Sequence, residues 1–175
     1  MDNGTDILKL FYEDKRDWSF CFENLVQLSR LKTYNNCKNF VINNTNLKNI
    51  KMFIERSIYS SYHVFAKNTY EENRLNKIEF DILTKYFQFF TTMPSNEQEI
   101  SSKFIYIKSN PETCLERIKL RNRESEQSIE LDYLIKLNIK YENWLLKLNK
   151  SNLIVLDGNL GKEKVFKEID KLLFY

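Results

Sequence analysis

Two groups of charged residues have the types and the spacing that phosphate chemistry needs. Glu55 and Arg56 follow a short apolar run directly. The guanidinium fork of an arginine fits phosphate oxygens, and a carboxylate beside it can hold a hydrated Mg²⁺. Arg117 and Arg121 share a helix face, and Arg123 follows before a polar loop, so together they can neutralise charge that develops during phosphoryl transfer. An ordinary ion pair and a solvated helix face are the respective alternatives.

A third set combines aromatic and polar side chains: Tyr12, Phe22, Glu23, Arg30 and Phe65. Glu23 and Arg30 are seven residues apart, two helical turns, so they can face the same space and either pair or bracket a polar ligand. Phe22 and Phe65 can stack on a planar base. An aromatic stripe is also typical of a hydrophobic core, and the sequence leaves both interpretations open.

Composition excludes several classes of protein. The 175 residues include 27 Lys+Arg and 24 Asp+Glu, which gives a net charge of +3. Charges of both signs in nearly equal number do not predict a nucleic-acid partner. His63 is the only histidine, which leaves little material for a catalytic triad or a histidine metal site. Three widely spaced cysteines fit reduced thiols. No signal peptide and no run of about 20 apolar residues is present, so we expect a soluble, cytoplasmic protein without a membrane partner, mitochondrial location not being excluded.

The positioning elements follow from apolar spacing. One domain over residues 1–175 is expected, with two consecutive helices over 6–31 that break at 13–17, and a mobile, Asn-rich connection at 34–49. Short strands are predicted at 50–54, 103–108 and 152–156, helices at 58–68, 77–90, 112–121, 131–149 and 161–173, and loops at 92–102 and 124–130. Ser57 and Asn110 are the expected helix caps, and Pro111 is the expected first helical residue.

Strands without polar alternation that alternate with helices predict a parallel α/β sheet. Ligands collect at the carboxyl ends of such strands. The residues at those ends are Glu55 with Arg56, Asn110 and Asp157. The sequence therefore places the first charged pair where binding sites form.

Two long segments resemble the deoxynucleoside kinase family, the group of cellular deoxycytidine and deoxyguanosine kinases and the insect multisubstrate enzyme. They are IERSIYSSYHVFAKNTYEEN at 54–73 and YIKSNPETCLERIKLRNRESEQSIELDYLIKLNIKYENWLL at 106–146. The resemblance also covers DILKLFYEDKRDWSFCFENLVQLSR at 6–30 and VLDGN at 155–159. It implies a P-loop-kinase-like three-layer α/β/α fold with a parallel sheet whose N-terminal strands are missing. The implied reaction moves the γ-phosphate of ATP to the 5′-hydroxyl of a deoxynucleoside.

The resemblance also implies a role for each candidate residue. Tyr12 and Glu126 would hold the sugar 3′-hydroxyl, and Phe22 and Phe65 would sandwich the base. Arg56 would lie by the 5′-hydroxyl and Glu55 near Mg²⁺. The residues that would surround the ATP phosphates and adenine are Arg117, Arg121, Arg123, Leu160, Gly161 and Lys162.

Two substitutions depart from the family pattern at the base. Glu23 stands where the family has a Gln, and an ionised carboxylate only accepts hydrogen bonds. Ser61 replaces the aspartate that deoxycytidine and deoxyguanosine kinases place opposite the arginine matched by Arg30. We therefore expect Glu23 to become the partner of Arg30, in which case Glu23→Gln changes base preference.

A further departure concerns the donor phosphates. Glycine occurs only at positions 4, 158 and 161, so the 175 residues contain no glycine-rich phosphate loop, and the family's first strand and catalytic glutamate are also missing. Either these parts of a kinase lie upstream, or the chain is a remnant that binds a nucleoside or a partner without turnover. In both cases the helices at 58–68 and 131–149 match the family's dimer interface, so a homodimer is expected.

Overall fold

The computed structural model describes residues 7–44, 46, 50–92, 103–145 and 147–174, with side chains for all of these except 125, 173 and 174. The chain forms two compact units, Met1–Gln98 and Glu99–Tyr175. The architecture is a helix-dominated α/β mixture with one small parallel sheet. The sequence expectation of a mixed α/β protein is thus confirmed, with less strand than predicted.

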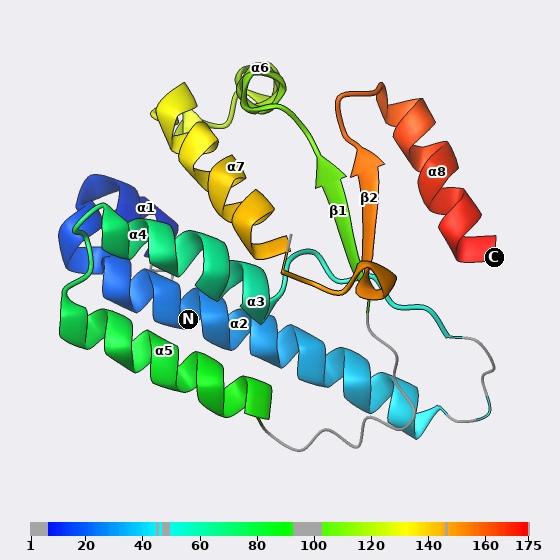
Figure 1. Cartoon of the computed structure of the whole chain (residues 1–175). Helices are drawn as coiled ribbons and strands as arrows, with labels where there is room; N and C mark the ends of the chain where they lie inside the picture. Colours follow the sequence, from blue (N-terminus) through cyan, green and yellow to red (C-terminus); the bar gives the residue numbers. More distant parts are fainter. Residues whose placement is uncertain (1–6, 45, 47–49, 93–102, 146, 175) are drawn as a thin grey trace. The chain divides into compact units, whose positions relative to one another are not determined.

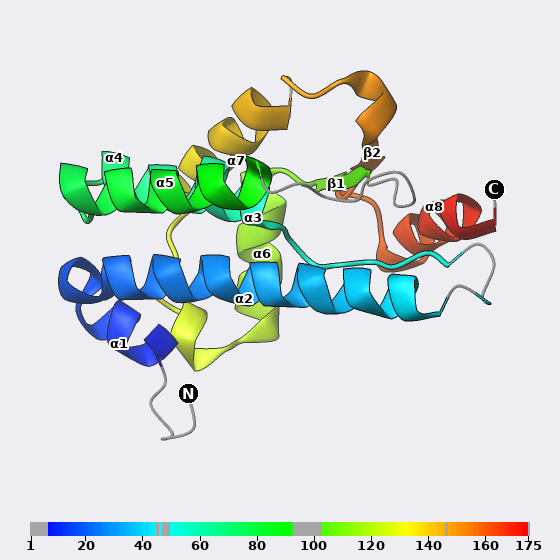
Figure 2. The ribbon, with the colours of Figure 1, turned by 90° about the horizontal axis from the view of Figure 1, so that it is seen from below.

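All regular secondary structure in the described part of unit 1 is helical. In chain order they are α1 (Ile7–Glu13), α2 (Lys15–Asn43), α3 (Ile58–Ser60), the π-helix η1 (Ser61–Ala66), α4 (Lys67–Glu71) and α5 (Lys77–Thr92) (Figure 1). In Figure 2, α2 runs along one side of the layer that holds α5 and the segment from α3 to α4. The core cluster between them contains Ala66, Leu75 and Leu83.

The predicted break between the first two helices is confirmed and has a local cause. The side chain of Asp14 accepts hydrogen bonds from the backbone N–H groups of Arg16 at 2.9 Å and Asp17 at 3.0 Å. Asp14 therefore caps the N-terminus of α2, where a carboxylate satisfies amides that have no partner within the helix.

Two predictions for unit 1 are wrong. The Asn-rich stretch is not a connection from residue 34 onward, because α2 continues to Asn43. Asparagine disfavours a helix by only a few tenths of a kcal/mol per residue, roughly, which an established helix tolerates. The predicted strand at 50–54 is also missing: these residues have no regular secondary structure. A strand needs a neighbour for its ladder hydrogen bonds, and among the described residues the two strands that do form pair with each other.

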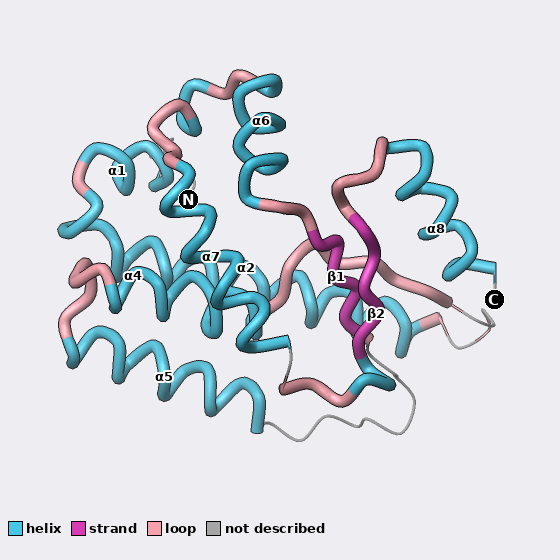
Figure 3. Tube along the Cα trace, turned by 45° about the horizontal axis from the view of Figure 1, so that its top comes forward, coloured by secondary structure: helices cyan, strands magenta, loops and turns pink. Residues whose placement is uncertain are grey.

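Unit 2 contains the parallel pair of strands and its helices. The elements are β1 (Phe104–Lys108), α6 (Pro111–Arg121), η2 (Glu124–Glu126), α7 (Leu131–Leu145), η3 (Lys150–Asn152), β2 (Leu153–Asp157) and α8 (Lys162–Phe174). The register pairs Phe104 with Leu153 and continues to Lys108 with Asp157. Figure 3 shows the two strands side by side, with β2 leading into α8.

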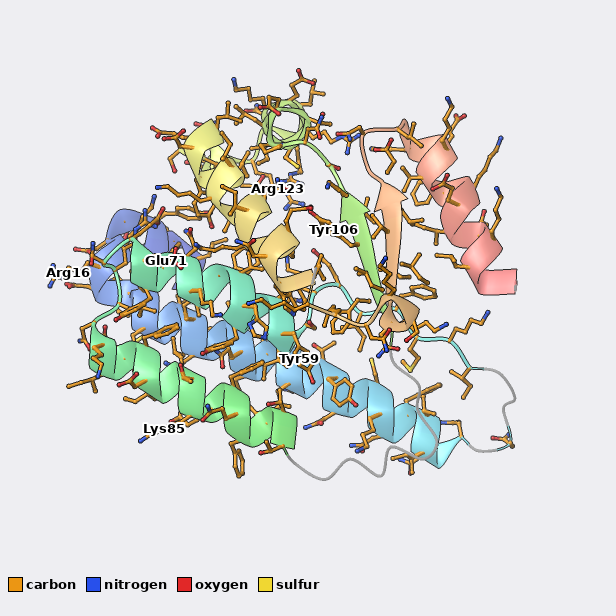
Figure 4. All side chains as sticks on the ribbon, in the orientation of Figure 1. Arg16, Tyr59, Glu71, Lys85, Tyr106 and Arg123 are labelled. Atoms are coloured by element: carbon orange, nitrogen blue, oxygen red, sulfur yellow. The ribbon has the colours of Figure 1, made fainter. Side chains whose placement is uncertain are left out.

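One face of β1 packs on α7. The ring of Phe104 meets Trp144 edge-on with centroids 5.4 Å apart, and the Tyr106 hydroxyl donates to Glu142 at 3.1 Å. Figure 4 labels Tyr106, which lies between β1 and α7. The Lys108 ammonium lies 3.0 Å from the same carboxylate. Burial raises the pKa of Tyr106, and the bond to Glu142 raises it further. The strand is therefore fixed against α7 by aromatic packing and one shared carboxylate.

Most predicted boundaries in unit 2 are close to those observed. Asn110 is the N-cap of α6 and Pro111 its first residue, as expected. The helix predicted at 131–149 ends at Leu145, and the loop at 124–130 begins with the short 3₁₀ helix η2. The loop predicted at 92–102 lies, beyond residue 92, outside the described residues.

Two further features concern membrane spans and cysteines. None of the helices in the described part of the chain has the length and apolar character needed to cross a membrane. Cys21, Cys37 and Cys114 form no disulfide with one another.

Candidate functional site

The turn that carries Glu55 and Arg56 is conformationally unusual. Arg56 has φ of 61°, in the left-handed region, which costs a non-glycine residue roughly 1 kcal/mol. The next residue, Ser57, stabilises the turn as a helix cap: its hydroxyl accepts from the Ser60 amide, and the Ser60 hydroxyl accepts from the Ser57 amide. Backbone strain that is held in place this way is typical of ligand sites.

Side chains from two elements meet at this turn. The Arg30 guanidinium, from α2, donates to the Glu55 carbonyl oxygen at 2.9 Å. The Arg56 guanidinium lies over the Phe65 ring, 4.7 Å from its centroid. Among the described residues neither Glu55 nor Arg56 forms an ion pair. The Arg30 guanidinium thus meets the backbone of this turn, and the Arg56 guanidinium meets an aromatic ring of η1, all within unit 1.

The two phenylalanines of the predicted base sandwich have different neighbours. Phe22 stacks on Phe11 with centroids 4.4 Å apart, and Phe11 meets Tyr12 edge-on at 5.4 Å. Phe65 instead lies under Arg56. Phe22 and Tyr12 thus share the α1–α2 corner of unit 1 through Phe11.

The expected Glu23–Arg30 pair is not formed. Glu23 is 2% exposed, and its Oε1 atom accepts a hydrogen bond from the Thr69 hydroxyl at 2.9 Å, whereas Arg30 binds the Glu55 carbonyl. Burial raises the pKa of the Glu23 carboxyl to about 7, against the lowering effect of the Thr69 bond. The buried position therefore favours a neutral carboxyl over the anion that would pair with an arginine.

The Ser61 side chain forms a hydrogen bond with the backbone one helical turn earlier. It is 1% exposed, and its hydroxyl donates to the Ser57 carbonyl at 3.1 Å. It therefore continues the capping network of the turn at residues 55–57.

Sequence reasoning missed two buried polar residues close to these groups, Gln27 and Thr69, which are 2% and 5% exposed. Gln27 follows Glu23 by four residues on α2, so the signal available in the sequence was their shared helix face. Thr69 carried no sequence signal, since its contact with Glu23 spans 46 residues.

In unit 2, the three arginines expected to bind phosphates, Arg117, Arg121 and Arg123, have two sets of partners. The Arg121 guanidinium contacts Glu126 Oε2 through two nitrogens, at 3.0 and 2.6 Å, and Arg123 lies 3.5 Å from Glu126 Oε1. Arg117 instead donates to the carbonyls of Gly158 at 2.7 Å and Leu160 at 3.3 Å. Glu126 thus holds two of the predicted phosphate-binding arginines, and Arg117 holds the predicted adenine loop.

That loop is also fixed to the end of β1. The Gly158 amide donates to the Lys108 carbonyl at 2.6 Å, and the Asn110 amide donates to the Asn159 side chain at 2.8 Å. The Asn159 side chain in turn donates to Asp157 at 3.0 Å. The carboxyl ends of both strands therefore form one hydrogen-bonded platform, as expected for a ligand site in a parallel sheet.

A small hollow of about 200 Å³ lies at the carboxyl end of α6. Its lining includes Ile118, Asn122, Arg123, Glu126 and Ile129. Asn122 adopts a left-handed conformation with φ of 49° and ends the helix there. Arg123 and Glu126 both line this hollow.

Metal ligands are sparse in the part of the chain that the structure describes. No group of three or more His, Cys, Asp or Glu side chains is arranged to hold a metal ion there. Glu55 is exposed and fits the single carboxylate with which a largely hydrated Mg²⁺ is commonly bound. Arg56 belongs to unit 1 and the other three arginines to unit 2, so their convergence on one phosphate site stays a prediction.

Comparison with known proteins gives the geometry a family context. The family model described as deoxynucleoside kinase matches residues 2–173. The chain is 37% identical to the deoxycytidine kinase of Homo sapiens over 147 residues, which are 82% of this chain and 54% of that protein. It is 32% identical to the deoxycytidine kinase of Rattus norvegicus over 97% of this chain and 68% of that protein. Its identity to the mitochondrial deoxyguanosine kinase of Xenopus laevis is 33%, over 84% of this chain and 53% of that protein.

The chain spans about half the length of several curated relatives that it matches. The match itself runs through the Glu55–Arg56 turn, the arginines of α6 and the loop after β2. Since nearly every described residue falls within the matched range, the chain belongs to the deoxynucleoside kinase family.

Proposed function

We propose that these 175 residues supply the nucleoside-binding and lid parts of a deoxynucleoside kinase, which transfers the γ-phosphate of ATP to the 5′-hydroxyl of a deoxynucleoside. The observation that carries this proposal is the gathering of Arg30, Glu55, Arg56 and Phe65 at one strained turn. The family match across both units supports a single kinase domain with a three-layer, P-loop-kinase-like arrangement.

In this proposal, unit 1 binds the acceptor. Phe22 and Phe65 enclose the base, and Tyr12 reaches the sugar. Arg56 lies beside the 5′-hydroxyl, where a fixed cation stabilises charge that builds up on the attacking and transferred oxygens. ATP supplies the phosphoryl group and Mg²⁺, held by Glu55, neutralises part of its charge.

Unit 2 supplies the lid. Arg121 and Arg123 exchange their present partner, Glu126, for phosphate oxygens, and the freed carboxylate accepts from the sugar 3′-hydroxyl. Arg117 supports the adenine loop at Leu160, Gly161 and Lys162 through its two carbonyl contacts. Positioning and electrostatics then account for most of the rate, as in other phosphoryl transfers.

A second function is favoured by one specific observation. The 175 residues contain no glycine-rich phosphate loop, because glycine occurs only at positions 4, 158 and 161. A subunit that binds a deoxynucleoside without turning it over fits that sequence. The predicted homodimer, through helices at 58–68 and 131–149, and the predicted cytoplasmic location apply to both candidates.

Two measurements on the same protein separate these functions. Transfer of labelled γ-phosphate from ATP to each of the four deoxynucleosides tests catalysis, and calorimetric titration with the same four compounds tests binding. Binding with turnover supports the kinase, and binding without turnover supports the subunit. Absence of both would contradict the proposal. Arg56→Lys is the informative variant, since it keeps the charge and removes the fork.

A further inference from the structure

The second half of α2 contains no buried residue. The last buried residue of this helix is Gln27, and none of residues 28–43 is buried. Two large apolar side chains in this part, Leu28 and Ile42, are 58% and 43% exposed. In Figure 1 and in Figure 2 this part of α2 runs past the end of α5. Isolated helices of about this length are marginal in water, and most helices in proteins are stabilised by packing of one face. The second half of α2 is therefore a candidate surface for a partner.

One face of this part has the spacing of a helix–helix contact. Five residues on it follow one another at alternating intervals of three and four: Leu28, Leu31, Asn35, Lys38 and Ile42. We call these five residues the α2 seam. This spacing is the one with which a helix packs lengthwise on a second helix. The seam is apolar at its ends and polar at Asn35 and Lys38, so a helix that fits it carries polar groups opposite these two residues.

The charge of this region has one sign. Residues 24–54 contain five lysines and arginines and no Asp or Glu, whereas the whole chain has a net charge of only +3. Arg30 donates to the Glu55 carbonyl. The other two cations of the second half of α2 are Lys38, within the seam, and Lys32, beside it, and among the described residues neither lysine forms an ion pair. Since charges across an interface are normally complementary, the partner of this face is acidic.

Three other occupants fit the α2 seam less well. A second copy of this chain brings lysine against lysine, Lys38 against Lys38 in a parallel pair and Lys32 against Lys38 in an antiparallel pair centred on Asn35, and such like-charge contacts are costly. A helix that lies on an anionic membrane keeps its cations on the face opposite its apolar residues, whereas Lys38 lies between the apolar ends of the seam. Nucleic-acid bases stack on planar side chains, and the apolar residues of the seam are aliphatic.

We propose that the α2 seam docks an acidic amphipathic helix of a partner protein. Apolar side chains of that helix pack on Leu28, Leu31 and Ile42, as in other complexes in which a helix is recognised by its apolar face. Its carboxylates pair with Lys32 and Lys38. None of the five seam residues is among those proposed to bind a deoxynucleoside, so this inference does not depend on the proposed function.

The test is fluorescence anisotropy titration of two labelled peptides with the full chain. Each peptide has about three heptads with Leu at positions a and d, and one carries Glu at e and g where the other carries Lys. The like charges keep each peptide from pairing with itself. We expect wild type to bind the Glu peptide about tenfold more tightly than the Lys peptide, because the charge pairs at Lys32 and Lys38 change from attractive to repulsive.

Lys38→Glu is the informative variant. We expect it to bind the Glu peptide more weakly and the Lys peptide more tightly than wild type does, so that the preference falls by about tenfold or reverses. A gain of affinity for the Lys peptide cannot result from a failure to fold. Asn36→Glu is the control, because it adds a negative charge at an exposed position on the other side of the same helix, and it should keep the wild-type preference.

Four results would overturn the inference. These are a wild-type chain that binds neither peptide, equal affinity of wild type for both peptides, an unchanged preference in Lys38→Glu, and an equal change of preference in Asn36→Glu. Vesicles of phosphatidylserine and an oligomer of dT are the probes for the other anionic occupants. If wild type bound either of them but not the Glu peptide, the α2 seam would recognise a membrane or a nucleic acid in place of an acidic helix.

Discussion

At the scale of single residues, Glu23 makes stability depend on pH. Burial raises the pKa of its carboxyl from an ordinary value of 4.5 to about 7. A raised acid pKa means that the folded state holds the proton more tightly, so the stabilisation is complete below pH 4.5 and is lost as pH rises through 7. At 1.36 kcal/mol per pKa unit, the loss between pH 4.5 and alkaline pH is on the order of 3 kcal/mol.

Urea unfolding of wild type and Glu23→Gln at pH 5.5 and 8.5 measures this effect. We expect wild type to lose stability relative to the variant as pH rises, because glutamine does not titrate. Glu13→Gln, on the exposed side of α1, is the control and should follow wild type. A difference between wild type and Glu23→Gln that stays constant across this range would contradict the prediction.

Glu126 allows a second prediction, in which stability and binding respond differently. Its ion pairs with Arg121 and Arg123 are partly exposed, so we expect Glu126→Gln to lower the free energy of unfolding by about 1 kcal/mol or less. The proposed bond to the sugar 3′-hydroxyl is also weakened. The measurement is the ratio of affinities for a deoxynucleoside and its 2′,3′-dideoxy analogue, which lacks that hydroxyl.

We expect the ratio to fall towards one in Glu126→Gln, through weaker binding of the deoxynucleoside alone. Glu124→Gln, in the same 3₁₀ helix, is the control and should keep the wild-type ratio. If Glu126→Gln and Glu124→Gln gave the same affinity ratio, the 3′-hydroxyl would be bound by a residue other than Glu126.

At the scale of elements, local signals in the sequence were sufficient for most helices. Ser57 and Asn110 cap helices as predicted, because a cap depends on a few neighbouring residues. The strand predicted at 50–54 failed for the opposite reason. Its apolar residues fit a strand, but a strand forms only when another strand lies beside it, and no local pattern contains that information.

The candidate site divides in the same way. The Glu55–Arg56 turn and the arginines of α6 were visible as motifs, whereas the contact between Glu23 and Thr69 joins residues 46 positions apart. The expected Glu23–Arg30 pair relied on spacing along one helix. Spacing predicts which side chains share a helix face, but the elements packed against that face decide their partners. Arg30 binds the Glu55 carbonyl, and Glu23 accepts a hydrogen bond from the Thr69 hydroxyl.

The platform at the strand ends gives the prediction for this scale. A Cβ atom at Gly158 would lie 2.9 Å from the Lys108 carbonyl oxygen and 2.9 Å from Ile107 Cγ2, so the backbone would have to move. We expect Gly158→Ala to destabilise the protein by roughly 1–3 kcal/mol, as overpacking does. It should also loosen the loop that Arg117 holds.

Gly161→Ala is the matched control, since a Cβ atom there meets nothing within 4 Å. Thermal unfolding compares the two variants with wild type. Equal melting temperatures for both would show that the platform tolerates the displacement.

At the scale of the whole molecule, the two proposed functions differ in which ligand stabilises the fold. A ligand that binds only the folded state at 100 times its Kd adds about 2.7 kcal/mol. For a chain of 175 residues that corresponds to a rise in melting temperature of roughly 5–10 °C. We expect each deoxynucleoside at saturating concentration to produce such a rise, because the acceptor residues are gathered in unit 1.

ATP alone should give a much smaller rise. A phosphate loop binds through a series of backbone N–H groups, and these 175 residues contain no glycine-rich sequence that can form one. The lid arginines are at present occupied by Glu126 and by loop carbonyls, so they contribute little until those contacts are exchanged. Free deoxyribose is the control for the deoxynucleosides, since it lacks the base. If ATP stabilised the chain as much as a deoxynucleoside does, the chain would bind the donor phosphates without a glycine-rich loop. The proposal of a subunit that binds a deoxynucleoside without turnover would then lose its support.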